Sequence, residues 1–348
     1  GTNLTGTSSP SAGPYPTVRQ LPWQPVLIVG TGINNGRFLG RLDLVFDDFG
    51  VIKEWSGAPI ILDDASPIDT DMQKDILVRQ LVVDNASDLI VGSSTVPLGF
   101  ENNCMFGECT LGSWSTDVMR AATGAQVGLY NGGSMYAAIP AGNITLGMLR
   151  TALPFQNGEP RTYNLRGDHL WSAMENSLLL VTNTSLNINQ GIGRFLQVSG
   201  MRVIYNPHEQ VGWRVVHIEI ETSPGVWEAI DKTRAYLVVS FSWLSGVGGD
   251  GYTMIRDNLT NLKSTGLTSG TIWITSLGQQ PLTHVDGGRL NTTSLTLRTC
   301  IAPDGQLCSG NGACVMGTCQ CTAAGASGPL CSLDAQSSSS GSSDGLTG

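Results

Sequence analysis

The feature that most constrains this sequence is the placement of its cysteines. The chain has eight cysteines, and six of them lie between Cys300 and Cys331, in the last fifth of its 348 residues. A segment of about 32 residues cannot bury enough apolar surface to form an adequate core. Disulfides that constrain the unfolded chain, typically worth about 2 to 4 kcal/mol each, replace that core in small secreted domains. The pattern therefore indicates a cross-linked module in an oxidising compartment.

The spacing of these cysteines indicates the kind of module. The intervals are seven, five, four, one and nine residues, between Cys300, Cys308, Cys314, Cys319, Cys321 and Cys331. With the glycine-rich stretch at 309–312, this pattern resembles the EGF-like module. The resemblance implies the pairing Cys300–Cys314, Cys308–Cys319 and Cys321–Cys331. The remaining two cysteines, Cys104 and Cys109, are expected to close a short disulfide loop of their own.

Metal binding is the alternative use of such a cysteine cluster. Structural zinc sites prefer cysteine pairs two to four residues apart, and one residue separates Cys319 from Cys321. A calcium-binding EGF-like subtype would have acidic residues just before its first cysteine, and residues 297–299 offer none. We therefore expect no metal and no cofactor.

Charge and glycosylation motifs narrow the partners and the location. The net charge is −9 with only 19 Lys plus Arg and no basic run, which disfavours nucleic acid and anionic membranes as partners. No stretch approaches the roughly 18 apolar residues of a membrane span. Glycan attachment is predicted at the six Asn-x-Ser/Thr sequons, Asn3, Asn85, Asn143, Asn183, Asn258 and Asn291. Cysteines and sequons together predict an extracellular glycoprotein, secreted or at the cell surface.

Apolar periodicity predicts an α+β fold with both helical and alternating segments. Helices are expected at 69–83, 112–122, 145–153, 167–180 and 251–262, the first of them capped by Asp69 or Thr70. Strands are expected at 26–29, 42–46, 60–62, 127–130, 161–165, 201–205, 213–221, 235–241 and 271–275. The early strands form a β-meander, with a turn at 47–50.

A series of motifs in the central segment points to one family. The motifs are Gly112 to Met119, Asn131-Gly132-Gly133, Leu153 to Phe155, Leu165 to Gly167, Phe195 to Gly200 and Gly248 to Tyr252. In this order they resemble the C-terminal, substrate-recognition domain of the 5′-nucleotidase and UDP-sugar hydrolase family. The resemblance implies a mixed-sheet domain of that kind. Residues 36–62 resemble the last strands of the family's catalytic metallophosphoesterase domain.

Catalysis is not expected from this chain alone. The family hydrolyses phosphate esters with two metals held by His, Asp and Asn, and the resemblance places all those ligands upstream of the present sequence. The four histidines, His169, His208, His217 and His284, lack mutual metal-ligand spacing. The N-terminus has neither Met nor a basic, apolar signal, so a mature or excised piece is expected.

The recognition site of the family survives here in part. The resemblance implies ligand contacts at Asn131, Gly132, Gly133, Phe155 and Asp250. Where the family has two arginines and a second aromatic residue, this chain has Gly107, Tyr136 and Leu244. Trp243 is adjacent, but it would point to the opposite face if that segment were extended. Loss of the two cations makes tight nucleotide binding doubtful.

Structural roles are the alternative for each surviving residue. The glycines of the two glycine-rich motifs could serve turns that need positive φ. Asp250 could cap the helix that follows it, and Phe155 could pack in a loop core. The sequence leaves both interpretations open.

Five segments and three functions follow from these patterns. The expected segments are a linker or inter-subunit arm at 1–25, a β-meander and linker helix at 26–84, the 5′-nucleotidase C-terminal-like domain at 85–299, an EGF-like module at 300–332 and a Ser/Gly-rich tail at 333–348. Unpaired strand edges in the meander favour a homo-oligomer formed by strand addition. The favoured hypothesis is a non-catalytic structural or adhesive glycoprotein that assembles into filaments. The alternatives are the C-terminal half of a processed 5′-nucleotidase and a nucleotide-binding module.

Overall fold

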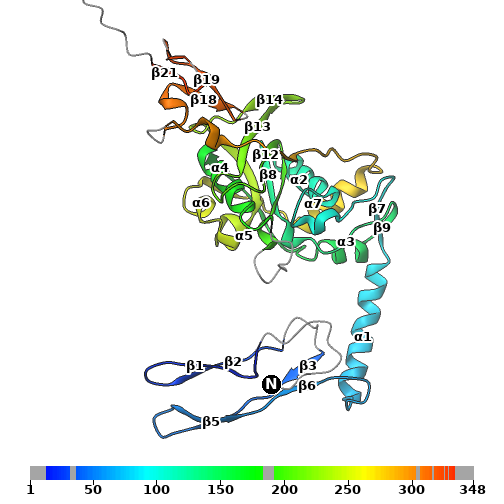
Figure 1. The fold of residues 1–348 in the computed structure, drawn as a ribbon. Coiled ribbons are helices and arrows are strands. Elements are labelled where there is room, and N and C mark those ends of the chain that lie inside the picture. The colour runs from blue at the N-terminus through cyan, green and yellow to red at the C-terminus, as the bar shows by residue number, and fades with distance from the viewer. Residues whose placement is uncertain are drawn as a thin grey trace, which may run out of the picture. The chain divides into compact units, whose positions relative to one another are not determined.

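The computed structural model describes residues 13–31, 37–182, 192–302, 306–315, 317–324, 326–327 and 329–333. The chain divides into two compact units, Gly1–Leu81 and Val82–Gly348 (Figure 1). Of the six sequons, Asn3 and Asn183 lie outside the described residues, and the other four asparagines are not buried.

The smaller unit consists of short antiparallel strand pairs. Its pairs are β1 (Thr17–Gln20) with β2 (Pro25–Ile28), β3 (Phe38–Gly40) with β6 (Pro59–Ile61) and β4 (Asp43–Phe46) with β5 (Ile52–Ser56). The expected turn at 47–50 is present, because the Asp47 carboxylate accepts hydrogen bonds from the backbone N–H groups of Phe49 and Val51. Among the described residues up to Leu81, Phe38 alone is buried. The described part of the unit therefore has strand pairing without a hydrophobic core of its own.

Helix α1 (Thr70–Ser87) follows these strands, and Asp69 caps its first turn. The Asp69 carboxylate accepts from the N–H groups of Asp71 and Met72 at 3.0 Å each. The helix has apolar residues on every side, and none of its side chains is buried.

The larger unit is built on a five-stranded mixed sheet in the order β11-β8-β15-β10-β16. These strands are β11 (Leu196–Ser199), β8 (Val127–Asn131), β15 (Ala235–Phe241), β10 (Pro160–Arg166) and β16 (Thr260–Ser264). Every pairing is antiparallel except that of β8 with β15, which is parallel. Side chains alternate between the faces: Val127 and Leu129 join one core cluster, and Tyr130 joins the other. Both faces of the sheet are therefore covered.

Helices and a second sheet cover those two faces (Figure 1). Apolar side chains of α2 (Thr110–Thr123) and α7 (Ser269–Gln279) build one cluster, and those of α4 (Gly167–Ser177) build the other. The second sheet has the order β14-β13-β12-β17, and it packs into the α4 cluster. Its strands are β14 (Val226–Ala229), β13 (Val215–Ser223), β12 (Met201–Tyr205) and β17 (Leu290–Thr292).

The remaining elements of this unit are short. They are β7 (Ile90–Ser94) paired with β9 (Gly142–Thr145), α3 (Leu146–Ala152), α5 (Ser242–Ser245), α6 (Thr253–Arg256) and the 3₁₀ turns η1 (Glu101–Cys104), η2 (Gly132–Ser134), η4 (Ile192–Arg194), η5 (Gly249–Gly251) and η6 (Leu297–Cys300). The architecture is the expected α+β class with mixed sheets. No helix in the described ranges is long and apolar enough to cross a membrane.

Two expected elements were wrong. Residues 271–275 form part of helix α7 and not a strand, because Thr268 caps the helix and Ile272, Trp273 and Leu277 are buried on one side of it. The expected helix at 251–262 is only α6, and residues 260–264 are the edge strand β16, paired with β10. In both places tertiary packing overrides local propensity.

The C-terminal segment is held by three disulfides, Cys300–Cys314, Cys308–Cys319 and Cys321–Cys331, the pairing that the EGF-like resemblance implies. Its strands are β18 (Gly312–Val315) with β19 (Thr318–Cys321) and β20 (Ala326–Ser327) with β21 (Ser332–Leu333), and η7 is Cys308–Gly310. Its buried cluster consists of Cys300, Cys308 and Cys331. The cystines themselves therefore form the interior of this segment.

Arg289 connects three elements of the larger unit. Its buried guanidinium donates to the carbonyl oxygens of Ser113 in α2 and Val198 in β11, at 3.2 and 2.8 Å. It also donates to Asp117 Oδ2 at 2.5 Å, while Ser199 Oγ donates to Asp117 Oδ1. The side chain thus ties helix α2 and strand β11 to the start of β17.

Replacing Arg289 with Met should destabilise the larger unit. The change leaves two backbone acceptors and one carboxylate oxygen without their donor, and hydrogen bonds to charged groups contribute roughly 1.5 to 3 kcal/mol. Because Asp117 is 38% exposed, we expect a loss near the lower end, about 2 kcal/mol. Urea unfolding of the full chain, followed by tryptophan fluorescence, measures it. The control is Arg298→Met, which removes a half-exposed guanidinium that lies 3.4 Å from Glu209 and should cost less, under about 1 kcal/mol. Equal losses in the two variants would contradict the assignment.

Candidate functional site

A cavity of about 470 Å³ in the larger unit brings together most of the residues singled out in the sequence. Its wall consists of Tyr130, Asn131, Gly133, Ser134, Phe155, Gly158, Gly193, Phe241, Ser242, Trp243 and Asp250. Asn131, Gly133, Phe155 and Asp250 are among them, although 119 positions separate the first from the last. Of the expected set, Gly132 alone is not part of the described wall.

The strand arrangement explains why these residues meet. Strands β8 and β15 are parallel neighbours, so their carboxyl ends lie at the same edge of the sheet. Asn131 is the last residue of β8, and the turn η2 with Ser134 follows it. Phe241 is the last residue of β15, and helix α5 with Trp243 follows it. The site therefore lies where ligands commonly bind in open α/β sheets.

Close packing, and not positive φ, requires the two glycines after Asn131. A Cβ on Gly132 would lie 1.9 Å from the Cys104 carbonyl oxygen, and one on Gly133 would lie 2.7 Å from Gly193 Cα. Neither glycine has a left-handed conformation, so the turn interpretation was wrong for them. It holds for Gly248 and Gly251, whose φ values are 65° and 84°.

The loop closed by the Cys104–Cys109 disulfide packs against the turn that follows Asn131. The buried side chain of Gln197 in β11 donates to the carbonyl oxygens of Cys104 and Gly107 at 2.9 Å each. It also accepts from the Cys109 N–H at 3.1 Å. Because the Cys104 carbonyl touches Gly132, the loop fixes the position of the Asn131 turn.

Asp250 accepts hydrogen bonds from side chains of the cavity wall and does not cap a helix. Its Oδ2 accepts from Trp243 Nε1 at 3.1 Å and from Asn131 Nδ2 at 3.5 Å. The residue before α6 is Tyr252, which has no side-chain cap. Asp250 also has a φ of 56°, a left-handed conformation that costs energy for a residue with a Cβ. Its side chain is thereby held in the wall of the cavity.

Two aromatic side chains of this wall are half exposed. Phe155 is 53% exposed and Trp243 is 50% exposed, whereas Leu244 is only 1% exposed. Trp243 was expected to point away from the site only if its segment were an extended strand. Residues 242–245 instead form helix α5, and Trp243 lies in the wall. The indole lies against Gly249, where an added Cβ would come within 2.1 Å of Trp243 Cε2. The Asp250 hydrogen bond and the bare Gly249 backbone together fix the indole.

Tyr130 is a site residue that the sequence did not single out. It lines the cavity and is only 2% exposed, and its hydroxyl lies beside Ser134, another residue of the wall, without a close hydrogen bond. Burial raises the pKa of this phenol well above its ordinary value, so it is neutral at physiological pH. A polar ligand atom in the cavity could form a hydrogen bond with this hydroxyl.

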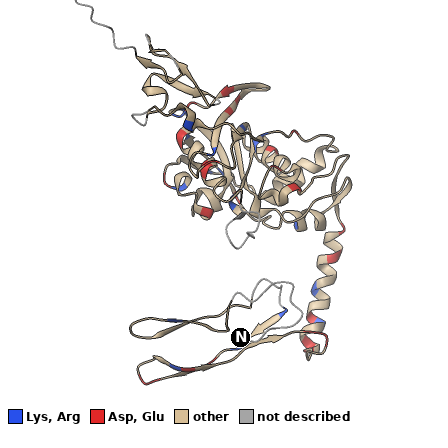
Figure 2. Ribbon diagram, in the orientation of Figure 1, with Lys and Arg blue, Asp and Glu red and all other residues tan. Residues whose placement is uncertain are grey.

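Among the described residues of the wall, Asp250 is the one charged side chain. Gly107 packs on Asn102, and the exposed ring of Tyr136 contacts Phe155 edge-on, with ring centroids 6.2 Å apart. Figure 2 shows Lys and Arg interspersed with Asp and Glu along the ribbon.

A larger cavity, about 620 Å³, lies between α2 and α7. Its ionisable groups already have partners: Asp117 binds Arg289, and His284 Nε2 lies 2.9 Å from Asp286 Oδ1. Among its described lining residues, none has an unpaired buried polar group comparable to the Tyr130 hydroxyl. The smaller cavity is the stronger candidate.

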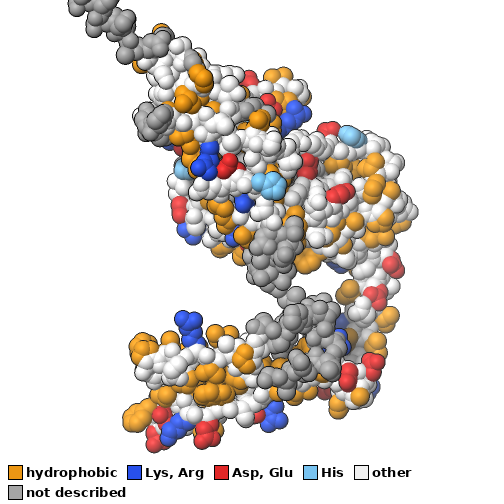
Figure 3. All heavy atoms as spheres, in the orientation of Figure 1, with side chains coloured by type: hydrophobic (Ala, Val, Ile, Leu, Met, Phe, Trp, Pro, Cys, Tyr) orange, Lys and Arg blue, Asp and Glu red, His pale blue; other side chains and the backbone are white. Residues whose placement is uncertain are grey.

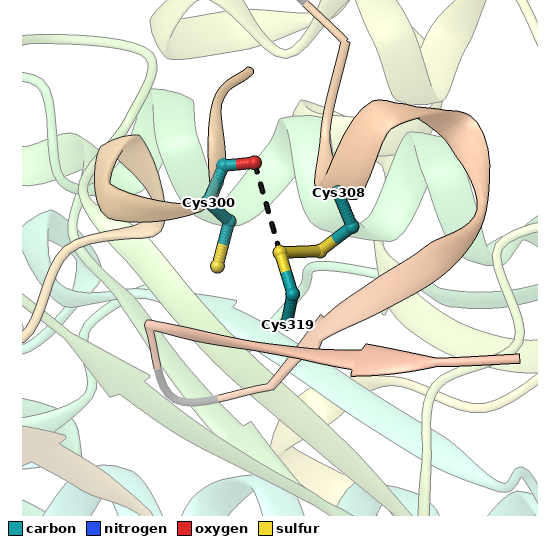
Figure 4. Close-up of side chains that lie close together, drawn as sticks. All are labelled: Cys300, Cys308 and Cys319. Atoms are coloured by element: carbon teal, nitrogen blue, oxygen red, sulfur yellow. Dashed lines mark hydrogen bonds between the residues drawn. A yellow bond between two sulfur atoms is a disulfide. The ribbon is translucent and has the colours of Figure 1, made fainter. Parts of the chain in front are cut away.

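One side-chain cluster of the described residues has the geometry of a metal site. The sulfur atoms of Cys300, Cys308 and Cys319 lie within 4.8 Å of one another (Figure 4). Each of the three is part of a disulfide, and Cys319 Sγ lies 3.8 Å from the Cys300 carbonyl oxygen. A disulfide sulfur is not the thiolate that zinc binds, so these residues do not fit a metal centre.

Comparison with known proteins decides the nature of the larger unit. Residues 90–257 match the family described as "5'-nucleotidase, C-terminal domain". The chain contains a 5′-nucleotidase C-terminal domain. All the described residues of the candidate site lie within the matched range.

Relatives and solved structures agree with this 5′-nucleotidase C-terminal domain. An apyrase of Tabanus yao is 32% identical over 263 residues, which are 72% of this chain and 46% of the apyrase. The 5′-nucleotidase of Mus musculus is 30% identical over 271 residues, 71% of this chain and 44% of that protein. The chain spans about half the length of the curated relatives it matches.

Two solved structures share the fold. The 5′-nucleotidase precursor of Thermus thermophilus aligns with a TM-score of 0.58 and 29% identity, over 82% of this chain and 56% of that one. A putative 5′-nucleotidase of Staphylococcus aureus has a TM-score of 0.63 at 17% identity, over 80% and 54% of the two chains, and supports the fold.

Replacing Gly249 with Ala should displace the Trp243 indole within this 5′-nucleotidase C-terminal domain. The new methyl group would occupy the space of the ring, while the backbone at this position tolerates alanine. In a ¹H–¹⁵N spectrum of the indole N–H groups of the eight tryptophans, the Trp243 signal, assigned with Trp243→Phe, should move. The control Gly278→Ala, in an open position of α7, should leave all signals in place. An unmoved Trp243 signal in the Gly249 variant would contradict the packing described.

Proposed function

We propose that the larger unit binds the nucleoside part of nucleotides, as the substrate-recognition portion of a nucleotidase-type protein. The observation that carries this proposal is the cavity between Phe155 and Trp243, which holds the polar groups of Asn131, Asp250 and Tyr130. Its volume of about 470 Å³ lies in the usual range for small-molecule sites, about 300 to 1,000 Å³.

Each part of the wall suits one part of a nucleoside. Half-exposed aromatic rings attract the flat faces of bases, and stacking contributes roughly 1 to 3 kcal/mol per base. Carboxylates and amides form hydrogen bonds with sugar hydroxyls and base edges. The relatives named apyrase and 5′-nucleotidase support the same class of ligand.

We further propose that the described residues of this chain do not hydrolyse the phosphate ester. Hydrolysis by the family's two-metal chemistry needs carboxylate, histidine or asparagine ligands at one place. In the described ranges, the one close group of three His, Cys, Asp or Glu side chains is the cystine cluster. Binding is the activity for which the chain has suitable groups.

Replacing Phe155 with Ala should weaken nucleotide binding. Loss of one stacking surface should raise the Kd for AMP by about 5- to 150-fold, the equivalent of about 1 to 3 kcal/mol. Isothermal titration calorimetry on the full chain measures the Kd. Because Phe155 is half exposed, the melting temperature should change little. The matched control is Phe49→Ala, which removes a 92% exposed ring of the smaller unit and should leave the Kd unchanged. Equal affinities of wild type and Phe155→Ala, or binding of neither AMP nor adenosine by the wild type, would refute the proposal.

A structural, self-assembling role is the second candidate, and one observation favours it. The smaller unit exposes large apolar side chains on its strands, including Val45 and Phe46, each more than half exposed. Figure 3 shows hydrophobic side chains gathered on this unit. Exposed strands with apolar faces favour association with further chains. An EGF-like module and glycans would suit such an extracellular assembly.

Electron microscopy of the full chain tests this second candidate. If strand addition operates, negative-stain images at increasing concentration should show filaments or ordered oligomers. Val45→Lys should shift the particles toward single subunits, because a charge on a strand opposes pairing with another chain. The control Val226→Lys changes a valine of similar exposure on the edge strand β14 of the larger unit and should leave assembly intact. Single subunits at every concentration would refute the role.

A further inference from the structure

The charge of the candidate cavity is opposite to that expected for a phosphate site. Within the described part of its wall, Asp250 is the one acidic side chain, and no Lys, Arg or His side chain lies there. Arg194, next to Gly193 of the wall, donates to Asn176 Oδ1 at 3.1 Å, and Arg161 pairs with Glu159 at 3.5 Å. Phosphates are normally bound by arginine or lysine side chains or by backbone N–H groups at helix N-termini. A phosphate placed here would meet a carboxylate instead.

The polar groups that do line the cavity suit an uncharged ligand. The Tyr130 hydroxyl is buried beside Ser134 and makes no close hydrogen bond among the described residues. Asp250 Oδ2 is held by Trp243 and Asn131, while Oδ1 receives no hydrogen bond from the described residues. That oxygen can accept from hydroxyl groups of a ligand. Two aromatic faces, one open carboxylate oxygen and one neutral phenol together match a base joined to a sugar diol.

We infer that the cavity recognises the nucleoside itself and gains no affinity from a 5′-phosphate. This inference rests on the proposed function and adds to it the class of ligand, a neutral nucleoside such as adenosine. The lack of affinity for the phosphate follows from the lack of an arginine in the described wall of the cavity. By the sequence resemblance, Tyr136 and Gly107 occupy the positions at which the family has arginines. Tyr136 lies at the side of Phe155, so a cation at this position would lie close to a stacked ligand.

Calorimetric titration of the full chain with adenosine and AMP, at low and at high salt, tests the inference. Adenosine should bind as tightly as AMP within about threefold, or more tightly. Added salt should leave the AMP affinity unchanged or improve it, because screening reduces repulsion by Asp250. An AMP affinity at least tenfold above that of adenosine, and weakened by salt, would overturn the inference and leave the proposed function standing. Failure of both ligands to bind would refute the proposed function instead.

A gain-of-function variant tests the assigned cause. Tyr136→Arg should create a preference for AMP over adenosine of about tenfold or more, because it supplies a charge-assisted donor. Tyr136→Gln, which loses the same contact with Phe155 and adds no charge, should keep the ratio of the wild type. The ratio of the AMP and adenosine affinities is compared, since both variants remove the ring that contacts Phe155. An unchanged ratio in Tyr136→Arg would overturn the missing cation as the cause.

Discussion

The parallel pairing of β8 with β15 is the constraint on which the rest of the larger unit depends. The register joins Val127 to Val238 and Gly128 to Val239, so both strands run toward the same edge. Gly128 permits close packing of α2, because a Cβ there would lie 2.8 Å from the Thr116 carbonyl oxygen. With the strands fixed between two packed faces, the residues after their carboxyl ends meet. Asn131, Trp243 and Asp250 thereby form one wall although three separate chain segments supply them.

The larger unit, the C-terminal segment and the smaller unit are stabilised by different interactions. The larger unit buries two clusters of apolar side chains on the faces of one sheet. The C-terminal segment buries cystines, because so short a stretch lacks apolar residues to enclose. The smaller unit has paired strands with a single buried side chain, Phe38, in its described part. Two-stranded ribbons of this kind are marginally stable in water, so the larger unit carries most of the folding free energy of the chain.

Much of this arrangement could be predicted from the sequence, because fold-level patterns are local and redundant. The order of the glycine-rich motifs indicated the 5′-nucleotidase C-terminal domain, and periodicity indicated its α+β class. The direction in which individual side chains point was harder to predict from the sequence. Trp243 could be placed only after residues 242–245 were known to be helical, and the burial of the Tyr130 hydroxyl arises from packing against Phe241 and Trp273. Residues 271–275 have strand-forming side chains, and the Thr268 cap with burial of Trp273 makes them a helix.

The charge of the cavity has a consequence for any nucleotidase that uses such a domain. Catalysis gains only from interactions that are stronger in the transition state than in the ground state. A wall that binds base and sugar binds substrate and product nucleoside equally, because hydrolysis alters only the phosphate. Recognition of the phosphate must then come entirely from the groups that carry out hydrolysis. In the proposed mode of binding, the contacts of Trp243 and Phe155 with base and sugar are the same before and after hydrolysis, so these two residues would contribute affinity and no transition-state stabilisation.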